Sequence, residues 1–182
     1  MRIIGGLFRG RNLEFPDLAG LRPSLGRTRE TLFNWLAPSI RNTRCLDLYA
    51  GSGALGFEAL SRGAAQATMV DSSSQVAQAL SDSAAQLGLD ASQVTVQHST
   101  AERFLQSAPA PFDLIFLDPP FADRVLSDVL AQIEQLDLLS SDGMIYYEAS
   151  RQTIFDPGTL VSHRRGQAGG YQYGLLTRHP NG

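Results

Sequence analysis

Short apolar runs alternate with longer segments of helical spacing along the chain from residue 44 onward. The runs are about four to six residues long and rich in branched or aromatic side chains, which indicates buried strands; they cover 45–49, 67–70, 94–97, 112–117 and 144–148. Between them, apolar residues recur three and four positions apart and predict helices at 55–61, 75–87, 101–106 and 124–136. This alternation predicts an α/β fold, with a mostly parallel sheet and helices on both of its faces.

The two ends of the chain depart from this pattern. Residues 160–164 and 171–178 predict a C-terminal antiparallel hairpin, which brings the sheet to seven strands. Residues 2–4 and 12–15 predict a small N-terminal hairpin, and a helix is expected from Ser24 or Thr28 to the residue before Pro38. We therefore expect an N-terminal extension over residues 1–40 and a main domain over 41–182.

Charge is distributed unevenly between these parts. Residues 1–44 hold eight arginines against three acids, a net charge of +5, whereas residues 45–182 hold seven arginines against fifteen acids, a net charge of −8. Arginine binds phosphate through a planar fork and stacks on bases. The asymmetry predicts a nucleic-acid-facing arm on an acidic body, although a solvated edge hairpin is the alternative. The expected RNA-binding residues are Arg2, Arg9, Arg11, Arg22, Arg27 and Arg29.

Composition excludes several classes of protein. No apolar run approaches the roughly 18 to 20 residues that cross a bilayer, and the first residues lack the apolar core of a signal peptide. Cys45 is the only cysteine, so an internal disulfide is impossible. The three histidines, His98, His163 and His179, are isolated in sequence, and no metal is expected. We predict a cytoplasmic protein that does not bind a membrane.

A glycine-rich loop follows the first strand of the main domain and opens a helix. It runs from Asp47 to Gly56, and Asp71 lies 18 residues after Gly53 at the end of the next strand. Such a loop lets a ligand approach the backbone, and the distal acid is placed to bind ribose hydroxyls. The G-x-G-x-x-G spacing leaves a dinucleotide open, but Asp47 suits a ligand with a positive ammonium and sulfonium, such as S-adenosylmethionine. The loop residues expected to bind are Asp47, Tyr49, Ala50, Gly51, Ser52 and Gly53.

A second motif follows the strand 112–117, where Asp118, Pro119, Pro120 and Phe121 occur in succession. Pro119 keeps Asp118 out of the helical region, and the prolines form a stiff turn that offers carbonyl acceptors without N–H donors. An acid, a rigid carbonyl and an aromatic ring together suit a planar base with an exocyclic amine. These four residues are the expected catalytic set, with an ordinary strand-ending turn as the structural alternative.

These motifs resemble those of class I S-adenosylmethionine-dependent methyltransferases, which have a Rossmann-like fold. The N-terminal segments from Arg2 to Gly6, Arg9 to Arg11, Leu21 to Pro23 and Arg27 to Asn34, together with Asp118 to Phe121, resemble more narrowly the RsmD family. The resemblance implies methylation of the N2 amine of a guanine in 16S ribosomal RNA, free or in a partly assembled small subunit. It also implies S-adenosylhomocysteine as product and further cofactor contacts from Ser72, Thr100 and Ala101. We expect a monomer, although the sequence itself leaves the oligomeric state open.

Two positions differ from the family's pattern. Ser72 to Ser74 stand where a second acid is usual, and Ser99 to Ala101 stand where Asn or Asp often contacts adenine. Three other functions stay open from the residues alone: a DNA adenine-N6 methyltransferase, an NAD-dependent dehydrogenase and a non-catalytic RNA-binding module.

Overall fold

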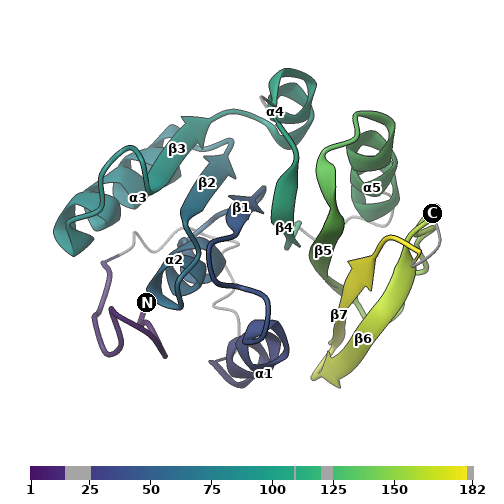
Figure 1. The fold of residues 1–182 in the computed structure, drawn as a ribbon, viewed down its shortest axis with the longest axis horizontal. Coiled ribbons are helices and arrows are strands. Elements are labelled where there is room, and N and C mark those ends of the chain that lie inside the picture. The colour runs from purple at the N-terminus through teal and green to yellow at the C-terminus, as the bar shows by residue number, and fades with distance from the viewer. Residues whose placement is uncertain (15–25, 109, 120–124, 180–182) are drawn as a thin grey trace.

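A seven-stranded sheet forms the centre of the protein in the computed structural model, which describes residues 1–14, 26–108, 110–119 and 125–179 (Figure 1). The strands are β1 (Arg44–Asp47), β2 (Gln66–Asp71), β3 (Val94–His98), β4 (Phe112–Leu117), β5 (Leu139–Ser150), β6 (Val161–Ala168) and β7 (Tyr171–Thr177). Their order is β3-β2-β1-β4-β5-β7-β6. Strands β1 to β5 pair in parallel, and β7 runs antiparallel to both β5 and β6. The predicted fold class, with its C-terminal hairpin, is confirmed.

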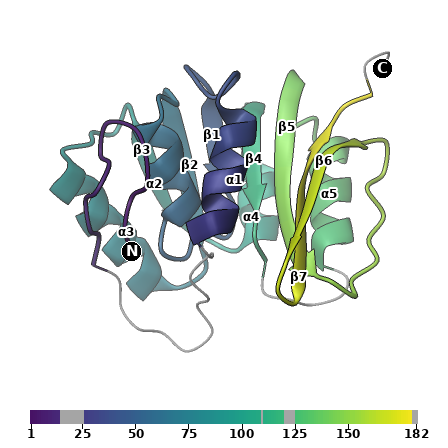
Figure 2. The same ribbon diagram turned by 90° about the horizontal axis from the view of Figure 1, so that it is seen from below.

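Helices cover both faces of the sheet (Figure 2). They are α1 (Gly26–Leu36), α2 (Ala54–Ser61), α3 (Ser74–Leu87), α4 (Ala101–Ser107) and α5 (Val125–Gln135). Side chains alternate between the two faces of a strand, so Phe116 packs in the cluster under α1, α2 and α3, while Ile115 packs in the cluster under α4 and α5. Within the described part of the chain, every helix is too short or too polar to span a bilayer.

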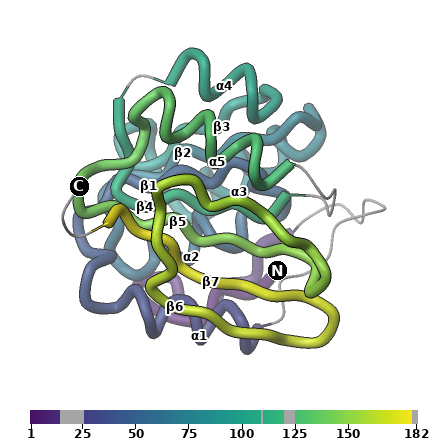
Figure 3. Tube along the Cα trace, turned by 90° about the vertical axis from the view of Figure 1, so that its right-hand side faces the viewer, coloured from purple at the N-terminus to yellow at the C-terminus, as the bar shows by residue number. Residues whose placement is uncertain are grey.

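The C-terminal hairpin extends the sheet beyond its parallel part. Strand β7 lies between β5 and β6, and β6 forms the free edge (Figure 3). Trp35 of α1 stacks on Tyr173 of β7 with ring centroids 5.6 Å apart, so α1 packs partly on the hairpin. The turn between β6 and β7 lies beside the carboxyl end of β5, because Ser150 pairs with Tyr171.

Strand β5 begins five residues earlier than the expected 144–148. Ser140, Ser141 and Asp142 are polar and lie outside the predicted strand, yet Leu139 before them pairs with Phe112 of β4. The pairing shifts register between Phe112 and Leu114, and such irregularities leave polar residues at a strand's end exposed. The pairing partner lies far away in sequence, so local composition did not indicate it.

The N-terminal hairpin is looser than expected but joined to the main core. A single bridge between Arg2 and Asn12 replaces the two predicted strands, and residue 15 lies outside the described residues. Ile3 and Leu13 are 1% and 2% exposed and belong to the same cluster as Phe33 of α1. The domain boundary at residue 40 stays a prediction, whereas the packing shows one continuous core on this face.

Candidate active site

Four acids lie at the carboxyl edge of the parallel sheet. Parallel strands end at the same edge, which is the usual ligand site of an open α/β sheet. Asp47 ends β1, Asp71 ends β2, Asp118 follows β4 and Glu148 lies near the end of β5. The structure therefore brings together three acids that the sequence singled out and one that it did not.

Two glycines at the turn from β1 into α2 have no room for a Cβ. Gly53 has a φ of 71°, and a Cβ there would lie 2.5 Å from the Phe57 ring. A Cβ on Gly56 would lie 2.5 Å from the methyl of Met69, so this glycine lets α2 pack closely on β2. The tight turn is closed by the Gly53 N–H, which donates to the Ala50 carbonyl at 2.7 Å. The G-x-G-x-x-G spacing is thus explained by turn geometry and close packing.

Asp47 lies under this loop and is 2% exposed. Its Oδ2 accepts a hydrogen bond from the Gly56 N–H at 3.0 Å. Burial raises the pKa of Asp47 to about 7, with a further contribution from the nearby Asp71. No described residue forms an ion pair with Asp47, so a cationic ligand at this edge would favour its charged form.

Asp71 joins the glycine loop to the start of α3. Its Oδ2 accepts from the Gly51 N–H at 3.0 Å, and its Oδ1 accepts from the Ser73 N–H at 2.9 Å. Each carboxylate oxygen has a second lone pair, so Asp71 retains acceptor capacity for ribose hydroxyls. Ser72 is exposed, and its carbonyl lies 3.1 Å from Nε2 of His98.

The remaining expected cofactor residues line the same edge with different exposures. Ala50 is buried and Ser52 is half-buried. Tyr49 packs against the α4–α5 core, and its buried hydroxyl has no hydrogen-bond partner among the residues that the structure describes. Thr100 caps α4 by accepting from the Arg103 N–H at 3.3 Å, and Ala101 is buried in the first turn. The Thr100 hydroxyl keeps a second lone pair and its own O–H, so it can still form a hydrogen bond with adenine.

Asp118 is half-buried, and none of the described residues donates a hydrogen bond to its carboxylate. Burial, together with the negative charges of Glu148 and Asp47, raises the pKa of Asp118 to about 8. Pro119 is buried. Pro120 and Phe121, the other two expected catalytic residues, lie outside the described residues.

Glu148 is the acid that the sequence did not single out. It is 5% exposed, and its Oε1 accepts from the Tyr146 hydroxyl at 2.7 Å. Burial raises the pKa of Glu148, although the bond from Tyr146 opposes this. The available signal was its place at the end of an apolar run next to the run that ends at Asp118. Beside it, the Tyr171 hydroxyl lies 2.6 Å from Oγ1 of Thr28, which ties α1 to β7.

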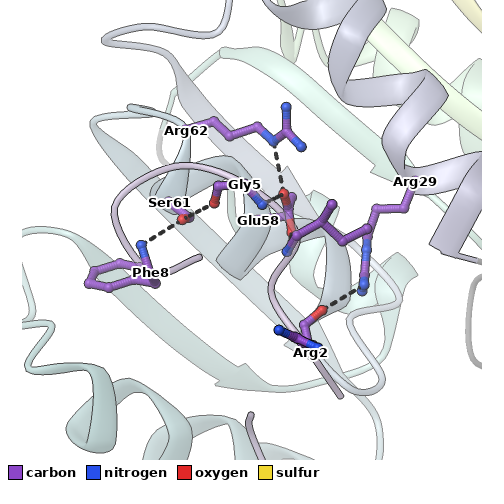
Figure 4. A network of polar contacts seen from close by, with 8 residues as sticks. Arg2, Gly5, Phe8, Arg29, Glu58, Ser61 and Arg62 are labelled. Atoms are coloured by element: carbon purple, nitrogen blue, oxygen red, sulfur yellow. Dashed lines mark hydrogen bonds and ion pairs between the residues drawn. The ribbon is translucent and has the colours of Figure 1, made fainter. Parts of the chain in front are cut away.

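The arginines expected to bind RNA fall into two groups. Arg2, Arg9, Arg11 and Arg27 are exposed, and Arg22 lies outside the described residues. Arg29 was expected at the surface but is only 6% exposed, and its Nη2 donates to the Arg2 carbonyl at 2.7 Å (Figure 4). Burial lowers the pKa of Arg29. The expectation that Arg29 contacts RNA is therefore corrected: its side chain lies beneath the N-terminal hairpin and donates to the hairpin backbone.

A buried carboxylate of α2 anchors the N-terminal hairpin (Figure 4). Glu58 is fully buried and accepts from the backbone N–H groups of Ile4 and Gly5, both at 2.8 Å. Arg62 Nε donates to the same carboxylate at 2.8 Å. One helical turn on, Ser61 Oγ accepts from the Phe8 N–H at 2.9 Å. The exposed arginines of the hairpin are thus held in a fixed position relative to α2.

One cavity lies away from these acids. It has a volume of about 280 Å³ and opens at the amino-terminal edge of the sheet, where Asn42, Asp113 and Ser140 line it. Asp113 already accepts from the Arg44 N–H at 2.8 Å and the Ser140 hydroxyl at 2.9 Å. Since the Asp113 carboxylate at this cavity is already paired within the protein, we assign the cavity no ligand. The described residues contain no group of three His, Cys, Asp or Glu side chains arranged for a metal ion.

Comparison with known proteins agrees with this architecture. A family model described as Conserved hypothetical protein 95 matches residues 1–177. The chain is 42% identical to Ribosomal RNA small subunit methyltransferase D of Escherichia coli K12, over 100% of this chain and 92% of that protein. It is 40% identical to the protein of the same name from Haemophilus influenzae, over 83% of this chain and 79% of that protein. The solved structure of yhhF from Escherichia coli superposes with a TM-score of 0.89 at 42% identity, over 98% of both chains. The chain therefore belongs to the RsmD family of methyltransferases.

Proposed function

We propose that this protein transfers a methyl group from S-adenosylmethionine to the exocyclic N2 amine of a guanine in 16S ribosomal RNA. The observation that carries the proposal is the position of Asp118, an acid with free acceptor capacity at the same sheet edge as the glycine loop and Asp71. The names of the relatives from Escherichia coli and Haemophilus influenzae support a ribosomal RNA substrate.

The donor set at this edge fits S-adenosylmethionine. When bound, the cofactor supplies a methyl group on a positively charged sulfur. Asp47 offers a buried carboxylate with no ion pair to a described residue, and the glycine loop lies beside it at the same edge of the sheet. Asp71 would accept the ribose hydroxyls, and Thr100 and Ala101 would border the adenine. A dinucleotide is less well suited, because a pyrophosphate near Asp47 would place like charges together.

Asp118 and the Pro119 carbonyl would hold the amine of the base. The N2 lone pair of guanine is delocalised into the ring, so the amine is a poor nucleophile. If these two acceptors take hydrogen bonds from its two N–H groups, the lone pair turns away from the ring.

Nitrogen gains positive charge as its new bond to carbon forms, and the fixed, half-buried carboxylate of Asp118 stabilises that charge. The amine becomes acidic once it carries this charge, so the ionised Asp118 carboxylate can take the proton that leaves nitrogen. Burial raises the pKa of Asp118 to about 8 in the free protein, and a positively charged ligand at this edge would favour the ionised form that the reaction needs. Phe121 would stack on the base, which is worth about 1–3 kcal/mol on other aromatic platforms.

A direct assay of the product tests the function. The protein is incubated with S-adenosylmethionine and either free 16S ribosomal RNA or partly assembled small subunits from a strain lacking the gene. Mass spectrometry of the digested RNA is expected to show N2-methylguanosine at one position. N6-methyladenine in a DNA duplex would favour the adenine methyltransferase, and no methylated product on any of these substrates would reject the proposal.

Removing two exposed arginines is expected to weaken RNA binding. The Arg9→Gln/Arg11→Gln double variant should lose roughly tenfold in affinity for RNA near physiological salt. With two phosphate contacts fewer, the variant releases fewer counterions from the RNA when it binds. The slope of log K against log salt should fall by about 1.4 for two single-strand contacts. Filter binding across a salt series measures both quantities. Arg41→Gln, an exposed arginine at the opposite edge, is the matched control; an unchanged slope in the double variant would assign Arg9 and Arg11 no contact with RNA.

A further inference from the structure

Glu148 stands next to Asp118 on the same face of the sheet. Strands β4 and β5 pair in parallel with Phe116 opposite Tyr146 and Leu117 opposite Tyr147. Continued by one residue, this register sets Asp118 opposite Glu148, and the negative charge of Glu148 raises the pKa of Asp118. Phe116 and Tyr146, two residues earlier, both point into the cluster under α1, with ring centroids 6.3 Å apart. Because side chains repeat every second residue, the two carboxylates emerge on that same side.

Burial of the Glu148 carboxylate costs free energy in the unliganded protein. It is 5% exposed, and the Tyr146 hydroxyl is its one hydrogen-bond donor among the described residues. The ion pairs within the described chain are Arg62–Glu58 and Arg178–Asp137, so no described arginine neutralises Glu148. A buried carboxylate with unused lone pairs, next to a second one, is costly unless a ligand supplies donors. This cost indicates a role in binding.

The Watson–Crick edge of guanine supplies such donors side by side. Its N1–H and its N2 amine point in the same direction, and two neighbouring carboxylates can accept from both. Adenine offers an unprotonated N1 at this position, whose lone pair would face a carboxylate oxygen. A buried acceptor left facing another acceptor costs far more than a lost contact in water, and sites built on such pairs discriminate by up to about 10⁴-fold.

We infer that Glu148 selects guanine by accepting the N1–H of the base while Asp118 holds the N2 amine, an inference that rests on the proposed function. The Tyr146 hydroxyl orients the carboxylate, because it donates to Oε1 and leaves Oε2 for the base. Asp118 supports transfer to nitrogen, whereas Glu148 decides which base presents that nitrogen. The substrate class follows: a purine with both an N1–H and a 2-amino group.

A substrate altered on its Watson–Crick edge separates these roles. Small-subunit RNA is assembled by ligation so that the target nucleotide is guanosine or 2-aminopurine, which keeps the 2-amine but lacks both the N1–H and the O6 carbonyl. Wild type and variant both meet the loss of O6, so a change in preference between the two proteins reports on the contact with N1. Wild-type protein is expected to prefer guanosine by at least 100-fold in kcat/KM. In Glu148→Gln the side-chain amide can donate to the bare N1, so the preference should shrink to below about tenfold.

Three outcomes separate the inference from the function beneath it. A preference that stays above 100-fold in Glu148→Gln, with both substrates slowed equally, would make Glu148 a structural partner of Tyr146 and overturn the inference. Wild-type protein that methylates both substrates equally would overturn it as well. Wild-type protein that methylates neither would instead reject the proposed function. Melting temperature and S-adenosylmethionine affinity test whether Glu148→Gln is folded. If it is not, Tyr146→Phe provides the same comparison. In that variant Glu148 loses the hydrogen bond that orients it, so a smaller loss of the preference for guanosine is expected.

Discussion

Asp118→Ala is expected to lower kcat for methyl transfer by about 10³-fold or more, while the affinity for S-adenosylmethionine changes little. The carboxylate acts where positive charge develops on the amine, and loss of one such fixed group typically costs 10²–10³-fold or more. The cofactor residues Asp47 and Asp71 lie on β1 and β2, and no hydrogen bond within the described chain joins them to Asp118. Single-turnover kinetics and calorimetric titration of the cofactor measure the two quantities.

Asp118→Asn is the matched variant, because it keeps the shape and removes the charge. Burial raises the pKa of Asp118 from 3.8 to about 8 in the folded protein. The folded state therefore binds this proton more tightly than the unfolded state, so the stability that the group contributes is present at low pH and is lost as pH rises from about 4 to 8. The asparagine variant escapes this loss and should melt at the same temperature as wild type, or higher, at pH 8. Asparagine protein with wild-type activity would contradict the assignment, and a lower melting temperature at pH 8 would contradict the buried charge.

Strand ends are the part of this site that a sequence can predict. Asp47, Asp71 and Asp118 each follow an apolar run, and parallel strands bring such ends to one edge. Glu148 follows the same rule, yet its role depends on the register between β4 and β5, which sets its neighbour. Register arises from pairing across 30 residues of chain, and the shift between Phe112 and Leu114 makes it harder to predict.

The burial of Arg29 was indicated by its helical spacing, but its charge led us to expect contact with RNA instead. Leu32 and Phe33 follow Arg29 by three and four residues, so all three lie on one face of α1. An arginine at this spacing is placed to be buried with its neighbours. Arginine is seldom buried without a partner, and the partner here is the Arg2 carbonyl, supplied by a distant segment. The helix face was predictable, whereas the acceptor was not.

The burial of Glu58, in contrast, has no signal in the sequence. In sequence Glu58 is a single charge on an apolar helix and has no local partner except Arg62, one turn away. Its burial follows from the N-terminal hairpin, whose backbone N–H groups at Ile4 and Gly5 need an acceptor. A long-range contact between backbone and side chain leaves no periodic pattern, so only the structure reveals it.

Glu58→Ala is expected to destabilise the protein by about 3 kcal/mol, because it leaves buried donors and the Arg62 guanidinium without their acceptor. For a chain of this size that lowers the melting temperature by roughly 6–12 °C. Below this temperature the damage should concentrate in the hairpin: the amides of Ile4 and Gly5 should exchange with solvent faster, and RNA affinity should fall because Arg2, Arg9 and Arg11 lose their fixed position. Binding of S-adenosylmethionine should persist.

Differential scanning calorimetry and hydrogen exchange followed by mass spectrometry measure these effects. Glu30→Ala, which removes an exposed acid on α1, is the control that should change neither the melting temperature nor the exchange rates. Unchanged exchange at Ile4 and Gly5 in Glu58→Ala would show that the apolar contacts of Ile3 and Leu13 hold the hairpin without the carboxylate.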